Sequence, residues 1–153
     1  MRNFEEISLL LHVMAERINE LISDCELEQA LIEKPNERLA GYDYCSKIKI
    51  SSSLEGELIL AISTGALKII LNEVFFFEFD ENEDDTLIYN GVCEFLNLIS
   101  ANSTRYMESI ELPIEIGIPE IIEDKKISDQ HEPLPAMRVN TEGGRILLTY
   151  KYI

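Results

Sequence analysis

The residues with the clearest chemical potential are a carboxylate and a carboxamide, Glu94 and Asn97, in the stretch Glu94-Phe95-Leu96-Asn97. On a helix, residues three apart emerge side by side on successive turns, so these two side chains would point in similar directions. A carboxamide donates and accepts hydrogen bonds without carrying a charge, which suits it to orienting a water molecule. Taken without its surroundings, however, the pattern is better explained as an ordinary polar helix face.

Other common reaction centres have little support. The sequence has neither a Gly-rich phosphate loop nor a dinucleotide-binding turn. His12 falls beside an apolar helical stripe and is expected to be a packing or surface residue, and His131 falls in a charged loop, so neither suggests a catalytic triad. Cys93 adjoins Glu94, and a neighbouring carboxylate disfavours the thiolate, which makes this cysteine a weak nucleophile.

The acidic run Asp80–Asp85 invites comparison with a calcium-binding loop, because its first, third and fifth positions are acids or amides. Its sixth position is Asp85 where an EF-hand needs Gly, and its twelfth is Gly91 where the bidentate Glu belongs. The favoured interpretation is a solvated loop that places negative charge before the next helix, where the helix dipole stabilises it.

The helix that would carry Glu94 and Asn97 is predicted from about Thr86 to Glu108. Its apolar residues recur at helical spacing and form one stripe, while the polar and small residues fall on another face. The predicted buried stripe comprises Ile88, Val92, Phe95, Ile99 and Tyr106, and the other face comprises Asn90, Glu94, Asn97, Ala101 and Thr104.

Helical and strand patterns elsewhere predict the elements around this helix. The aromatic run Val74–Phe79 is expected at a core edge or in an interface, and residues 24–46 show no regular pattern. The predicted elements are a helix over 3–23, strands over 47–51 and 58–62, a helix from about Gly65 capped by Ser63-Thr64, a strand over 114–119 whose Pro119 indicates an edge or a strand end, and a hairpin formed by 137–139 and 145–152.

Composition restricts the class of protein. The 153 residues suit one domain, 1–153, and the formal net charge of −16 argues against nucleic acid or an anionic membrane surface as partners. No apolar stretch is long enough to span a bilayer, and Glu5 and Glu6 do not fit a signal peptide. Three widely spaced cysteines, with no C-x-x-C pair, fit neither a disulfide framework nor a thiolate zinc site, so a cytoplasmic location is expected.

The segment 91–103, which contains Glu94 and Asn97, resembles the signature helix of the CheC/CheX class of chemotaxis phosphatases. That helix combines an E-x-x-N motif with a following apolar pair, a small residue and a second Asn. The resemblance extends to the strands at 56–63 and 114–119 and covers roughly residues 50–122. A single motif matches the CheX branch better than the two-site CheC branch, although Cys93 and Ala101 stand where members commonly have Gly.

This resemblance implies an α+β fold, with an antiparallel sheet flanked by helices, and a homodimer formed through strands. The late hairpin and the run Phe75–Phe79 are the segments suspected of carrying the dimer interface. It also implies a phosphatase that hydrolyses the phospho-aspartate of a CheY-like response regulator, with no cofactor of its own and Mg²⁺ on the partner's receiver domain. Asn97 would orient the attacking water, and Glu94 would contact a receiver Lys. Glu94 is less suited to be a general base, because its carboxylate would be a second anion close to the phosphoryl group and would work against attack.

Two other functions remain open on the same fold. One is a non-catalytic binding or adaptor module that recognises a receiver or another signalling protein through its acidic surface. The presence of Cys93 and Ala101, where family members commonly have Gly, favours this function. The other is an assembly protein of the flagellar-switch type, which is supported only by the analogy of fold.

Overall fold

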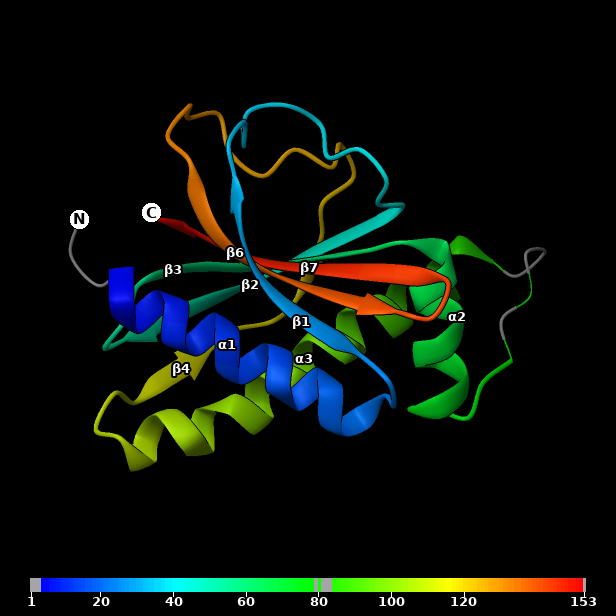
Figure 1. Ribbon diagram of the computed structural model, residues 1–153, viewed down its shortest axis with the longest axis horizontal. Helices are drawn as coiled ribbons and strands as arrows, with labels where there is room; N and C mark the ends of the chain where they lie inside the picture. Colours follow the sequence, from blue (N-terminus) through cyan, green and yellow to red (C-terminus); the bar gives the residue numbers. More distant parts are fainter. Residues whose placement is uncertain (1–3, 79, 81–83, 153) are drawn as a thin grey trace.

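One antiparallel sheet of seven strands, covered on one face by helices, forms the framework of the computed structural model, which describes residues 4–78, 80 and 84–152 (Figure 1). This is the α+β architecture that the sequence led us to expect. The helices are α1 (Phe4–Leu21), α2 (Thr64–Glu73) and α3 (Asp85–Ser109). The strands are β1 (Glu26–Ile32), β2 (Tyr44–Ser52), β3 (Gly56–Ile62), β4 (Ile114–Ile116), β5 (Glu120–Ile121), β6 (Leu134–Thr141) and β7 (Gly144–Tyr152).

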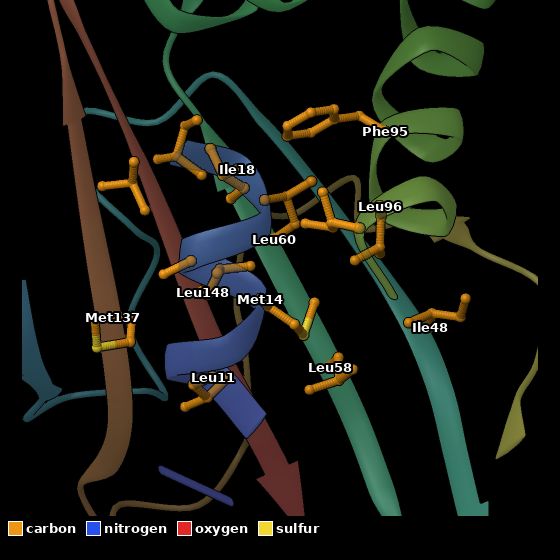
Figure 2. Close-up of a cluster of buried hydrophobic side chains, with 14 of the residues drawn as sticks. Leu11, Met14, Ile18, Ile48, Leu58, Leu60, Phe95, Leu96, Met137 and Leu148 are labelled. Carbon is orange, nitrogen blue, oxygen red and sulfur yellow. The ribbon is translucent and has the colours of Figure 1, made fainter. Parts of the chain in front are cut away.

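The order of strands across the sheet is β1-β6-β7-β3-β2-β4, and β5 also pairs with β2. Helices α1 and α3 lie side by side against one face, α1 mainly over β6 and α3 mainly over β2 (Figure 1). Because side chains alternate across a strand, every second residue of β2, β3 and β7 enters this helix-covered core. Core residues labelled in Figure 2 are Leu11, Met14, Ile18, Ile48, Leu58, Leu60, Phe95, Leu96, Met137 and Leu148.

The opposite face of the sheet is covered by the long connections instead of by helices. Leu39 and Ile122 pack there against buried strand residues such as Ile59 and Ala61. Since both faces are covered, β3 and β7 read as nearly continuous apolar runs rather than as alternating strands. The sheet is therefore a buried platform, and function has to be sought at its edges and on the outer sides of the helices.

Helix α2 begins where the sequence predicted, with Ser63 as its N-cap. The Ser63 hydroxyl accepts a hydrogen bond from the Ala66 N–H at 3.4 Å and another from the Arg145 N–H at 2.9 Å. Helix and β7 approach so closely here that a Cβ on Gly144 would collide with the Ala66 backbone. This contact fixes the start of α2 against the sheet.

The start of α2 offers a test of stability. The Asp43 carboxylate accepts hydrogen bonds from the Thr64 N–H and hydroxyl, each at 2.8 Å, and these bonds lower the pKa of Asp43. We expect Asp43→Ala to reduce the free energy of unfolding at pH 7 by about 1 kcal/mol, a small value because the carboxylate is largely solvated. Urea denaturation of both proteins measures this difference, and equal stability at pH 7 would contradict the assignment.

The same test has a defined pH dependence. Because the folded-state pKa of Asp43 is depressed, its contribution is complete above the unfolded value, about 3.9, and is lost as pH falls through the folded value. The difference between wild type and Asp43→Ala should therefore stay constant down to about pH 5, begin to shrink at about pH 3.9, where about half of the unfolded-state carboxyl is protonated, and vanish below the folded-state pKa.

Three sequence-based expectations need correction. Residues 26–32, for which no element was predicted, form the edge strand β1; with one paired neighbour and mostly exposed side chains, it lacks a clear apolar pattern. Tyr106 is 42% exposed, and Met107 is buried in its place, because the last turns of α3 are covered from β4 at the sheet edge. The late hairpin β6–β7 lies inside the sheet, so neither of its strands offers a free edge for pairing with a second copy.

Candidate functional site

Helix α3 positions the predicted site residues. Asp84 is its N-cap and accepts a hydrogen bond from the Thr86 N–H at 2.8 Å, and Asp85 adds negative charge in the first turn. The acids before this helix thus stand at its N-terminal end as expected. The remainder of the suspected calcium loop, residues 81–83, lies outside the described residues.

Within the motif, the two middle residues face inward and the two outer ones face outward. Phe95 and Leu96 are fully buried and point from α3 into the core (Figure 2). Glu94 is exposed and Asn97 is half-buried, one helical turn apart on the outer side. The two buried side chains hold the helix in one rotation about its axis, so the spacing of the motif places both polar groups at the surface.

Within the part of the chain that the structure describes, both polar groups of the motif lack a side-chain partner. Among the described residues, the Asn97 carboxamide and the Glu94 carboxylate take part in none of the side-chain hydrogen bonds or ion pairs of the structure. A surface carboxamide on a rigid helix, with its donor and acceptor both unused, can enter a partner's site and hydrogen-bond there.

Cys93 directly precedes Glu94 on α3 and is partly buried. Burial raises the pKa of the Cys93 thiol, and the Glu94 and Glu120 carboxylates raise it further. The pKa of Cys25 is raised as well, and burial raises that of Cys45 to about 11. All three cysteines are free. The raised pKa of Cys93, with burial as its largest cause, agrees with the prediction that this cysteine is a poor nucleophile.

Neither histidine lies on α3. His12 sits on α1 with its Nε2 2.6 Å from the Glu16 carboxylate, and His131 is exposed in the loop before β6. Within the described ranges, no group of three or more His, Cys, Asp or Glu side chains has the arrangement of a metal site. No described helix has the length and apolar character needed to cross a membrane.

The sequence did not predict the surface that surrounds the motif between α3 and the edge of the sheet. Alongside the C-terminal half of α3 runs a surface hollow of about 510 Å³, bounded by Ala101, Thr104 and Glu108 from the helix and by Pro113 and the three residues of β4. Ala101 and Thr104 follow Asn97 by one and two helical turns on the same side. The hollow therefore continues the motif face along the edge of the sheet; the only sequence signal for this edge was Pro119.

Comparison with known proteins agrees with this geometry. A family profile described as chemotaxis phosphatase CheX matches residues 44–137, which include β2, β3 and the whole of α3. A search among curated proteins found no match.

Solved structures show the same fold at low sequence identity. The chain is similar to one in the CheX-CheY-BeF3-Mg complex from Borrelia burgdorferi, with 16% identity over 95% of this chain and 96% of that one and a TM-score of 0.72. Chemotaxis protein CheX from Vibrio vulnificus gives 14% identity, 99% and 98% coverage and a TM-score of 0.70. FliY from Thermotoga maritima gives 15% identity, 96% and 88% coverage and a TM-score of 0.64.

Proposed function

Because the chain belongs to the chemotaxis phosphatase CheX family, we propose that it hydrolyses the phospho-aspartate of a CheY-like response regulator. The observation that carries this proposal is the arrangement of α3, with Phe95 and Leu96 locked in the core and Asn97 and Glu94 unoccupied at the surface. A similar structure, that of Borrelia burgdorferi CheX, is of a complex with CheY and BeF3.

In the proposed reaction the protein supplies positioning rather than covalent chemistry. An acyl phosphate is already reactive, and a Mg²⁺ ion held by the receiver domain would neutralise charge on the phosphoryl group. The Asn97 carboxamide would hold a water molecule in line with the phosphorus–oxygen bond to be broken. It adds no negative charge that would repel the phosphoryl oxygens, and no cofactor bound to this chain is required.

The proposal is tested by the decay of a radiolabelled phospho-receiver in the presence of Mg²⁺, with and without this protein. The CheY-like regulators of the source organism would be examined in turn. Acceleration by wild type that is lost in Asn97→Ala supports the proposal. Failure to accelerate the decay of any of the regulators would contradict it. A CheY-like receiver is a cytoplasmic signalling domain, so the expected cytoplasmic location belongs to the same proposal.

Glu94 would bind the partner rather than the water. Its exposed carboxylate, one turn before Asn97, would pair with a receiver Lys beside the phosphorylation site. We expect Glu94→Gln to raise KM about tenfold with kcat changed less than about threefold, since a charge pair desolvated by docking is lost. The effect should shrink at high salt. Steady-state kinetics at two salt concentrations, with Glu108→Gln as control, gives KM and kcat and their dependence on salt. A loss confined to kcat would instead indicate that Glu94 is a general base.

A homodimer is the second part of the proposal. The free edge of the sheet on the α1 side is β1, where Leu31 is 52% exposed and Phe4 of α1 is 42% exposed. These residues border an apolar groove between α1 and β1 that strand pairing between two copies would cover. Sedimentation at micromolar concentration should give a dimer that Leu31→Lys dissociates, whereas a wild-type monomer would contradict this part.

A non-catalytic adaptor on the same fold is the alternative function. It is favoured by the likeness to FliY and by Cys93 and Ala101, which add side chains on the face that would approach a partner. The adaptor would bind a receiver in a salt-sensitive manner without shortening the lifetime of its phosphoryl group. The decay experiment, run beside a binding measurement, separates the two functions.

A further inference from the structure

The edge of the sheet beside α3 contains an irregularity that the proposed function does not use. Strands β4 and β5 both pair with β2, Ile116 opposite Ile50 and Glu120 opposite Lys47. Between these pairs, the three residues 117–119 stand opposite only two residues of β2. The edge therefore carries a β-bulge of one extra residue, and bulges change the direction in which side chains leave an edge strand.

The bulge lies level with Asn97 along the helix. On one side of it, β5 contacts α3, and the Glu120 carboxylate in β5 raises the pKa of the Cys93 thiol. On the other side, residues 114–116 border the same hollow as Ala101. Cys93 precedes Asn97 by one turn and Ala101 follows it by one turn, so the residues between Ile116 and Glu120 lie at the level of Asn97 along α3.

A second observation places the bulge at the same level. β2 runs past the bulge at Ile48 and Lys49, and the Gly117 N–H donates to the Lys49 carbonyl at 2.8 Å. Helix α3 packs over β2, and Leu96 points from α3 into the core on the side of β2 that carries Ile48 (Figure 2). Leu96 is the residue immediately before Asn97. The part of β2 that lies opposite the bulge is therefore at the same level along α3 as the motif.

At this bulge the structure exposes a large apolar side chain. Ile118 is 84% exposed, although its neighbours on the edge, Ile114 and Ile116, are packed against the core. Pro119 follows it and has no N–H to donate, which suits an edge position that is not extended by another strand. An exposed isoleucine gains nothing for folding, but it would contribute to binding if a partner covered it.

We propose that Ile118 is an affinity-determining contact for the receiver domain, inserted into an apolar hollow on the receiver close to its phosphorylated aspartate. This inference rests on the proposed function and names a residue that the motif does not include. Asn97 and Glu94 supply polar contacts from the helix, and Ile118 supplies the apolar contact from the sheet edge. The partner surface that fits has an apolar depression next to a basic residue.

The test compares Ile118→Ser with wild type in two measurements. The first is KM and kcat for the phospho-receiver; the second is the Kd for the same receiver loaded with Mg²⁺ and beryllofluoride, a phosphoryl mimic that is not hydrolysed. We expect KM and Kd to rise about tenfold, with kcat within about twofold, because burial of an isoleucine side chain is lost while the water-positioning group remains. Thermal unfolding should be unchanged, since Ile118 is exposed.

The matched control is Phe76→Ser. Phe76 is 89% exposed and lies after α2, which Figure 1 shows at the opposite end of the molecule from β4. Loss of affinity in Ile118→Ser but not in Phe76→Ser supports the inference.

An unchanged Kd in Ile118→Ser, with wild type active and Asn97→Ala inactive, overturns the inference and leaves the proposed function standing. If wild type binds the loaded receiver without hydrolysing the phosphorylated one, the proposed function fails and the Kd comparison still decides the role of Ile118; if wild type binds none of the receivers, both fail.

Discussion

Replacement of Asn97 by alanine should reduce the catalysed rate of phospho-receiver hydrolysis about 100-fold or more, because the water molecule would lose its alignment with the phosphorus–oxygen bond. The loss should appear in kcat, since the carboxamide acts on the water rather than on the docking of the two proteins. Asn97 is half-buried and alanine is a better helix former, so the fold should be at least as stable as in wild type.

Two further variants make the result specific to the carboxamide of Asn97. Asn72→Ala removes an exposed carboxamide from a different helix, α2, and should leave kcat within about twofold of wild type. Asn97→Asp keeps the shape but adds a negative charge, and should be as inactive as Asn97→Ala because the charge repels the phosphoryl group. Full activity in Asn97→Ala would show that this residue does not position the water.

Replacement of Phe95 by alanine should have the largest effect on stability. Phe95 is fully buried between Glu94 and Leu96, and its ring enters the core from α3 (Figure 2). Removal of a buried aromatic ring costs about 3–5 kcal/mol, a large part of the roughly 5–15 kcal/mol that stabilises a domain. We expect Tm to fall by about 10 °C or more.

The control for Phe95 is the same substitution at an exposed phenylalanine. Phe76→Ala should change the free energy of unfolding by less than about 0.5 kcal/mol, because the ring of Phe76 already lies in water. Differential scanning calorimetry of both variants provides the comparison. Similar losses in both would mean that Phe95 does not anchor α3, and the fixed rotation of the helix that we infer for the motif would lose its support.

The candidate site could be predicted from the sequence to a large extent because it lies within one helix. Periodicity separated Phe95, on the core side, from Glu94 and Asn97, and the structure places these residues on those sides. The N-cap Ser63 and the acids that begin α3 were likewise visible as local signals. These features depend on residues within a turn or two of each other, so the chain specifies them without reference to the rest of the fold.

Other features could not be read from the sequence because they depend on partners far along the chain. The strand β1 pairs with β6, more than a hundred residues away, and its own residues show little pattern. The position of the late hairpin inside the sheet, rather than at its edge, is likewise a matter of strand order. Tyr106, which was predicted to be buried, is exposed, and Met107 is buried, because β4 decided which side of the last turns is covered.

The sequence by itself determined that α3 exists, which of its sides faces the core, and that Glu94 and Asn97 lie on the other side. Only the tertiary structure decided what lies at the same level on the sheet edge: the bulge at residues 117–119, where Ile118 is exposed. The physical reason is the range of the interactions involved. Helix phase is set by hydrogen bonds between residues four apart, whereas a bulge exists only through the register of one strand against another, here between residues separated by more than sixty positions of the chain.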